Sequence, residues 1–334
     1  MIRRHTGKRK SLFLFFMILS LGSVFLSAEE KENFNPFSVN LSTDFAYYPE
    51  SKCRESTQDI HFAGLTGIYS SLECRSTLSA KYTIKTPLGE HWLTKDANVF
   101  FTGAVEVTPV SVRPMLSAGF SPLPFIVLKG GASAGFAWNY LGLEGIAKFN
   151  KDSGEYETLS TISHPFYEFW AQSDFMFDTG ALIPGEWTHL IMLGSFRIFY
   201  SGIAGLERHD IYEWQTTKNM AQGLQYEASG LLAYQMPLAL YRAGIIFTAG
   251  GHFNGGDYGN LDSWYDGGFT KYSLSPALQF KLSAKDELLC LFQFANRRSF
   301  EQYHDKTEQE LFMKTTGQEW YFQRIALSWS HRFL

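Results

Sequence analysis

Residues Gln222–Met236 read QGLQYEASGLLAYQM, and this stretch decides the fold because its apolar residues recur at every second position. The other phase carries polar side chains, among them Glu227 and Gln235. A period of two over this length predicts a β-strand with two different faces and does not fit a helix. The apolar phase contains Leu224, Tyr226, Ala228, Gly230, Leu232, Tyr234 and Met236.

The same alternation runs through the C-terminal half of the chain, from residue 164 onward. Soluble sandwiches also alternate, so the pattern alone does not decide between a soluble and a membrane protein. Strand length favours a membrane barrel, because transmembrane strands need about nine to eleven residues, whereas strands of soluble domains cluster near five or six. The alternating segments lie near 167–178, 189–200, 222–236, 241–252, 271–282, 288–297 and 320–334.

All formal charges within these seven segments lie on the less apolar phase, which we expect to face the lumen of a barrel. The apolar phase is then free to face hydrocarbon. The predicted lumen residues are Glu168, Asp174, Asp178, Arg197, Glu227, Arg242, Lys271, Lys281, Arg297, Arg324 and Arg332.

Connections between the segments alternate between tight and long. Tight ones fall at 183–186, 235–237 and 284–286, and long polar ones at roughly 204–221, 254–267 and 299–317. This rhythm is typical of barrels with short periplasmic turns and long extracellular loops. Aromatic residues near strand ends would form the interfacial girdles: Tyr47, Tyr48, Trp138, Tyr140, Tyr200, Trp264, Tyr265 and Trp320.

The N-terminal half is less regular. We expect strands near 37–48, 59–70, 75–85, 97–120 and 124–140. Pro109 and Pro114 interrupt the fourth, which implies a bulge or a turn that splits it. Bacterial single-chain barrels have even strand numbers, so the sequence predicts an all-β, antiparallel, up-and-down barrel of about twelve strands, with ten and fourteen open.

The first 28 residues have the organisation of a secretory signal peptide. A basic segment ending at Lys10 precedes an uncharged run, Ser11–Ala28, which closes on the small residues Ser27 and Ala28. We therefore expect cleavage near Ala28 and a single barrel domain over 29–334. The alternative is an uncleaved anchor helix, but the apolar core is shorter than the roughly twenty residues that span a bilayer.

The last strand carries the most specific local signal. One of its faces holds Tyr321, Ile325, Leu327, Trp329 and Phe333, and the chain stops one residue later. This resembles the C-terminal signal of bacterial outer-membrane proteins, which the barrel-assembly machinery reads. The resemblance implies an outer-membrane location, with the lipid and that machinery as partners. It departs from the pattern in Leu334, which follows the aromatic residue, and in Gln323 and His331, which fall on the lipid phase.

Composition and motifs exclude several kinds of site. The formal charge of −4 and the lack of a basic block give no indication of nucleic acid. Cys53, Cys74 and Cys290 lack zinc-site spacing, so no metal or other cofactor is predicted, and pairing of Cys53 with Cys74 stays open.

Catalytic residues are not assigned either. None of the nine histidines is followed by serine two residues later, as in outer-membrane phospholipases. The neighbours His209–Asp210 and His304–Asp305 are the nearest to the acid–histidine pairs of outer-membrane proteases. The loop at 254–268 holds Asp257, Asn260, Asp262 and Asp266, which suggests either a calcium or sugar site or a solvated hairpin tip.

The predicted lumen charges give the functional expectation. Seven are basic and four acidic, a net charge of +3, and rings of arginine and lysine favour anions in pores. The sequence therefore predicts a porin-like narrow channel for small hydrophilic solutes with a mild anion preference. A plugged barrel, a lipid-modifying or proteolytic barrel, and a surface adhesin or receptor are the alternatives.

Overall fold

The structure, a computed structural model, describes residues 35–52, 61–160, 162–259, 261, 264–301 and 309–334. The predicted signal peptide, Cys53 and the His304–Asp305 pair lie outside these residues. Within the described part, no helix is long and apolar enough to cross a membrane.

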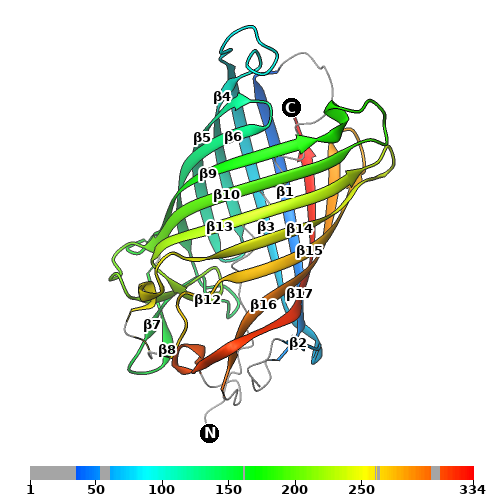
Figure 1. Ribbon diagram of the computed structural model, residues 1–334. Coiled ribbons are helices and arrows are strands. Elements are labelled where there is room, and N and C mark those ends of the chain that lie inside the picture. The colour runs from blue at the N-terminus through cyan, green and yellow to red at the C-terminus, as the bar shows by residue number, and fades with distance from the viewer. Residues whose placement is uncertain (1–34, 53–60, 161, 260, 262–263, 302–308) are drawn as a thin grey trace.

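Twelve antiparallel strands form one closed barrel, in which each strand pairs with the next along the chain and the last pairs with the first (Figure 1). The predicted up-and-down barrel is confirmed. The strands are β1 (Phe37–Glu50), β3 (Gly67–Lys85), β4 (Asn98–Thr108), β5 (Ser111–Leu123), β6 (Ile126–Ala137), β9 (Phe166–Asp178), β10 (Leu190–Ile203), β13 (Gly223–Gln235), β14 (Leu240–His252), β15 (Lys271–Lys281), β16 (Asp286–Phe300) and β17 (Thr315–Arg332).

The remaining elements lie in the connections. Strand β2 (His61–Ala63) pairs in parallel with β17. A second, four-stranded sheet has the order β12-β11-β7-β8. Its strands are β7 (Ile146–Asn150), β8 (Glu155–Thr158), β11 (Ile211–Trp214) and β12 (Thr217–Ala221), and the short 3-10 helices are η1 (Thr179–Ala181), η2 (Gly255–Tyr258) and η3 (Glu310–Phe312).

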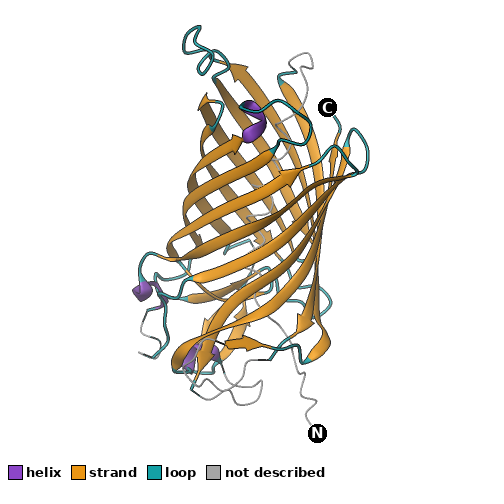
Figure 2. Ribbon diagram, turned by 45° about the vertical axis from the view of Figure 1, so that its right-hand side comes forward, coloured by secondary structure: helices purple, strands orange, loops and turns teal. Residues whose placement is uncertain are grey.

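The two ends of the barrel differ in their connections (Figure 2). We name one the turn end, where the strands are joined at 86–97, 124–125, 179–189, 236–239 and 282–285 and where β1 begins and β17 ends. At the other, the loop end, the connections are 51–66, 109–110, 138–165, 204–222, 253–270 and 301–314. The alternation of short and long connections in the C-terminal half follows the prediction.

Two errors in the N-terminal half cancel in the strand count. The end of the predicted segment 59–70 and the whole of 75–85 form one long strand, β3, because Gly67–Lys85 continues without a break, and residues 61–63 form the separate strand β2. The predicted segment 97–120 forms two strands, β4 and β5, because the chain turns at Pro109 and Val110. Pro114 lies within β5 and is tolerated there. Five barrel strands therefore precede β9, as predicted, although β3, β4 and β5 have different bounds.

A β-bulge in β17 corrects the face assigned to Tyr321. Gln293 pairs with Arg324 and Phe294 with Phe322, so Gln323 is an extra residue in the ladder. An extra residue reverses the alternation. Tyr321 and Gln323 are consequently buried, whereas Leu327 and Phe333 on the other side of the bulge are exposed on the outer surface.

The outer surface of the barrel is apolar, as hydrocarbon requires. Large exposed hydrophobic side chains alternate with inward residues along the strands; among them are Phe101, Leu116, Phe169, Phe175, Phe196, Leu232, Phe247 and Leu327. Two of the expected girdle aromatics do not belong to this surface, since Tyr48 and Tyr265 are buried. Cys74 and Cys290 are free thiols on outward positions of β3 and β16.

Candidate functional site

All eleven predicted lumen residues lie on the phase that alternates with the exposed apolar side chains. Glu168, Asp174, Arg197, Arg242 and Arg324 are buried. Asp178, Glu227, Lys271, Arg297 and Arg332 are half-buried, and Lys281 is exposed at the end of β15. Whether they border a water-filled path stays a prediction, but they share the inner side of the wall.

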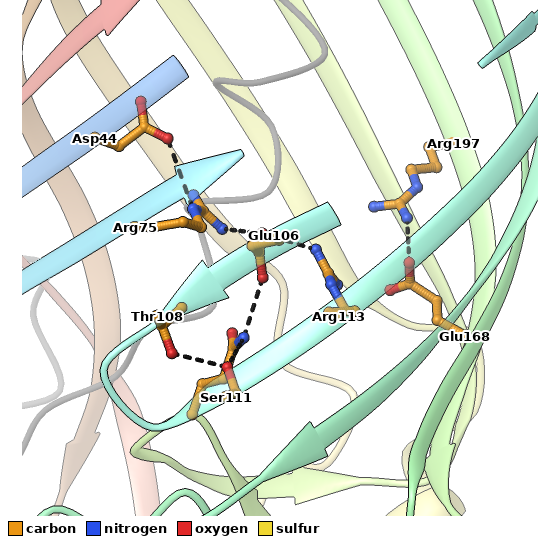
Figure 3. Close-up of polar contacts among 9 residues, drawn as sticks. Asp44, Arg75, Glu106, Thr108, Ser111, Arg113, Glu168 and Arg197 are labelled. Carbon is orange, nitrogen blue, oxygen red and sulfur yellow. Dashed lines mark hydrogen bonds and ion pairs between the residues drawn. The ribbon is translucent and has the colours of Figure 1, made fainter. Parts of the chain in front are cut away.

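An ion-pair ladder crosses the first strands of the barrel on its inner side (Figure 3). Asp44 on β1 lies opposite Arg75 on β3, with 3.6 Å between Oδ2 and Nε. The Arg75 and Arg113 guanidiniums each lie 3.0 Å from Oε2 of Glu106. Because each pair joins adjacent strands, the charges lie along the wall and brace it, rather than reaching across the lumen.

The ladder continues around the barrel. Glu168 on β9 lies 2.6 Å from Arg197 on β10, and Arg197 is the register partner of Glu227 on β13. Arg113 interacts electrostatically with Glu168, which links this group to the first. Opposite charges therefore follow one another from β1 to β13.

A third group lies where β17 meets β1. Arg324 donates hydrogen bonds to Gln293 (2.5 Å) and to the Tyr48 hydroxyl (2.9 Å), and that hydroxyl donates to Glu73 (2.8 Å). We name the whole set the charge belt. It has five carboxylates and four guanidiniums: Asp44, Glu73, Glu106, Glu168, Glu227, Arg75, Arg113, Arg197 and Arg324. The belt is nearly neutral, so it provides little anion preference.

The rest of the inner wall is not uniformly polar. Inward positions of β10, β13, β14 and β16 carry a contiguous apolar cluster that includes Leu193, Leu231, Ile246 and Leu291. Only the charged residues of this phase were predicted from the sequence, and the apolar cluster was not. With the charge belt, they divide the inner wall into a charged side and a more apolar side.

A hairpin from the 204–222 connection folds back onto the inner wall. Its strands β11 and β12 are joined by Gln215 and Thr216, and the Gln215 side-chain amide donates to Glu106 Oε1 (3.0 Å) and to Ser111 Oγ (2.7 Å). Trp214 stacks on Phe166 of β9, with ring centroids 4.6 Å apart. The long connection that the sequence predicts as a polar loop is therefore an ordered element that narrows the loop end of the lumen.

The turn of this hairpin is strained. Gln215 and Thr216 both have positive φ, 50° and 66°. A two-residue turn with this geometry normally takes asparagine or glycine, and a β-branched residue is especially disfavoured. The contacts of Gln215 and Trp214 with the wall hold the turn in this conformation.

The turn-end half of the inner wall holds more basic than acidic side chains. Lys129 lies 2.5 Å from Asp174. Lys81 lies over the Phe100 ring at 4.2 Å. The basic residues near this end are Lys81, Lys129, Arg242, Lys281 and Arg332, and the nearby acidic ones are Asp174, Asp178 and Glu287. The belt is nearly balanced, whereas this half of the wall carries an excess of positive charge.

The loop at 254–268 is partly packed and partly exposed over its described residues. Asp257 is buried and lies 3.1 Å from His252, and Tyr258 and Tyr265 pack against Phe149 and Leu311. Burial raises the pKa of the Tyr258 hydroxyl. Asn260 and Asp262 lie outside the described residues. Among those described, no group of three or more histidine, cysteine or acidic residues could hold a metal ion.

Of the two loop pairs considered for catalysis, His209–Asp210 lies within the described residues, and its aspartate has a structural partner. Asp210 lies 2.7 Å from Lys148 on β7, which fixes the 204–222 connection to the second sheet. His189, His252 and His331 each pair with an aspartate, at 2.9, 3.1 and 2.8 Å. These pairs join strand ends to neighbouring turns, and we assign none of them a catalytic role.

Several residues of the charge belt could have been found from the sequence. The apolar phase of the first strand, Phe37 to Tyr47, already places Asp44 and Tyr48 on the opposite face. Arg75 follows Cys74 directly, so in a strand their side chains lie on opposite faces. Glu106 and Arg113 were hidden by the merged segment 97–120. Gln215 gave no signal, because its role depends on where the loop folds.

Known proteins resemble the chain in architecture. No protein-family model matches it, and no curated protein matches it. Similar solved structures include the KdgM porin (8% identity, 89% of this chain and 99% of that chain, TM-score 0.35). The outer-membrane channel DcaP of Acinetobacter baumannii has 10% identity, with 89% and 96% covered and a TM-score of 0.36. The β-domain of the Bordetella autotransporter Brka has 6% identity, with 89% and 99% covered and a TM-score of 0.37.

Proposed function

We propose that this protein is a narrow outer-membrane channel for small hydrophilic solutes with a mild preference for anions. The observation that carries the proposal is the closed barrel with an apolar outer face and charged side chains on the inner side of most of its strands. Such an outer face suits a bilayer, because a closed sheet pairs every backbone group without exposing an edge. The inner charges suit water and ions.

The same proposal gives the protein an orientation and an export route. Long loops of bacterial barrels face outward and short turns face the periplasm, so the loop end would be extracellular. Residues 1–28 would be the cleaved signal peptide. The assembly signal would consist of Ile325, Leu327, Trp329 and Phe333 on the outer face after the bulge, without Tyr321, and its readers would be the barrel-assembly machinery.

The mild anion preference is assigned to the turn-end half of the lumen. Cations there outnumber carboxylates, whereas the charge belt pairs its charges. Basic residues along a narrow path raise the local concentration of anions. The expected selectivity is small, because Asp174 and Glu287 lie on the same wall.

The test is the reversal potential of the purified protein in a planar bilayer under a KCl gradient. The wild type should give a potential with the sign of anion preference, and Lys81→Glu with Arg242→Glu should shift it toward cations. Lys151→Glu is the control, since it makes a single basic-to-acidic change, half the charge change of the double variant, on the exposed β7–β8 turn. Absence of conductance, or equal shifts in both variants, contradicts the proposal.

Arg197 is a poor test residue for selectivity. Its guanidinium pairs with Glu168 and faces Glu227, so Arg197→Glu would place like charges together on three adjacent strands. A change in conductance would then report damage to the belt. Lys81 is the clearer of the two turn-end residues, because its ammonium lies over the Phe100 ring, whereas Arg242 is buried and donates a hydrogen bond to Gln235.

A further inference from the structure

The seam between β15 and β16 is incomplete at the loop end. Their register runs from Lys281 and Glu287 to Ser273 and Ala295. Strand β16 continues to Phe300, and over Asn296–Phe300 its register partners are on β17. The backbone ladder of the barrel therefore stops before the strands do.

Side chains of β16 replace the missing ladder bonds. The side-chain oxygen of Asn296, Oδ1, accepts the backbone N–H of Tyr272 at 2.7 Å. Its side-chain nitrogen, Nδ2, donates to the backbone carbonyl of Thr270 (3.2 Å) and to Gln318 Oε1 (2.6 Å). Arg298 donates to the Asp266 carbonyl at 3.0 and 2.7 Å. Its guanidinium also lies over the Phe269 ring, at 4.8 Å.

A cavity of about 530 Å³ lies at this seam. The cavity is wide open, so it would hold a ligand against its wall rather than enclose it. Tyr272 on β15 and Gln318 on β17 occupy outward positions, since Ser273 and Glu319 beside them are buried on the inner phase. The cavity consequently opens on the outer side of the wall, toward the membrane at the loop end.

The cavity combines aromatic surfaces with polar groups of both kinds. Trp264, Phe269 and Tyr272 supply the rings, and Trp264 is 59% exposed. The exposed Asp266 carboxylate accepts the Gly268 N–H at Oδ1 (3.0 Å) and has further lone pairs for a ligand; Gln318 accepts from Asn296 at Oε1 (2.6 Å) and has an amide group that can donate. Ring faces match the C–H faces of a sugar, and carboxylate and amide groups match its hydroxyls.

We propose that this seam binds a saccharide, in the form of the headgroup of a glycolipid in the surrounding membrane. The orientation assumed is the one proposed above, in which the loop end meets the outer leaflet. The same chemistry would accept a free saccharide, so the two sources need separate measurements. The site lies outside the lumen and does not require the barrel to conduct.

The experiment measures binding of two probes to the full-length protein in a detergent without sugar. The probes are rough lipopolysaccharide and its delipidated core oligosaccharide, and the readout is microscale thermophoresis. The wild type should bind lipopolysaccharide, and Trp264→Leu and Asp266→Asn should each weaken binding by about tenfold. Asp266→Asn keeps the backbone carbonyl that holds Arg298.

Matched controls separate the site from general effects. Trp187→Leu removes another exposed tryptophan, at the turn end, and Asp152→Asn changes another exposed aspartate, on the β7–β8 turn. Both should bind as the wild type does. The migration of unheated samples in gels shows that each variant is a folded barrel.

The outcomes are distinct. Binding of lipopolysaccharide alone supports the headgroup, and equal binding of the oligosaccharide supports the saccharide site with a free sugar as its ligand. Failure of both probes to bind, or wild-type binding by Trp264→Leu and Asp266→Asn, overturns the inference. Failure of the channel proposal appears separately, as a lack of conductance.

Discussion

Gln215 at the tip of the β11–β12 hairpin donates a hydrogen bond to Glu106 on the barrel wall, across 109 positions of sequence. This contact joins a loop-end connection to the charge belt, since Glu106 also pairs with the guanidiniums of Arg75 and Arg113. The hairpin and the belt therefore form one polar unit, and changes in one should be measurable in the other.

Removal of the Gln215 amide should release the hairpin. Gln215→Ala loses the bonds to Glu106 and Ser111, and the strained turn then lacks what holds it at the wall. We expect a larger or noisier single-channel conductance in planar bilayers. Gln309→Ala, at a loop-end glutamine outside the hairpin, should leave the trace unchanged, and identical traces for both variants would contradict the role of the hairpin.

Glycine at Thr216 should relieve the turn. A non-glycine residue at positive φ costs on the order of 1 kcal/mol, and Thr216 is β-branched with φ of 66°. Thr216→Gly should slow hydrogen exchange of the β11 and β12 amides. Thr217→Gly is the matched control, because Thr217 lies in β12, where glycine should speed exchange. Faster exchange in Thr216→Gly would show that the turn is not strained.

Loss of the Glu106 charge should destabilise the barrel strongly. Glu106→Gln leaves Arg75 and Arg113 without the carboxylate they share, and breaking a buried pair in this way costs about 3–5 kcal/mol. The measurement is the urea midpoint of unfolding in detergent micelles. Glu157→Gln, at an exposed position of β8, should leave the midpoint in place.

A double variant tests whether the cost comes from uncompensated charge. Adding Arg113→Met to Glu106→Gln removes one of the stranded guanidiniums, so part of the lost stability should return. If the double variant is less stable than Glu106→Gln by the full cost of Arg113→Met alone, the two residues act independently and the shared-carboxylate account is wrong.

Deletion of Gln323 should leave the register of the final strand in place. Because Gln323 is the extra residue of the bulge, its removal joins Phe322 to Arg324 with their partners Phe294 and Gln293 unchanged, so Tyr321 stays on the inner side. We expect normal barrel assembly, seen as the fast-migrating folded band in gels. Deletion of Ser328, which lies in the regular part of the ladder, shifts the register by one position and should reduce that band. Loss of the band in the Gln323 deletion would show that β17 needs the bulge.

The sequence by itself determined the barrel, its approximate strand number and the two faces of the C-terminal strands. These follow from a period of two, which depends only on local chain geometry and on the need of each strand for one apolar face. The same rule placed Glu168, Arg197 and Arg324 on the inner phase, and the structure brings them into the charge belt.

The tertiary structure decided where the rule is interrupted and what the loops do. The extra residue Gln323 places Tyr321 on the inner side. The turn at Pro109 puts Glu106 and Arg113 on two neighbouring strands, where they are register partners. Gln215 reaches Glu106 because a loop folds back on the wall. The Asn296 seam exists because, at the loop end, β16 extends beyond the residues that pair with β15. These contacts join residues far apart in sequence, and alternation carries no information about them.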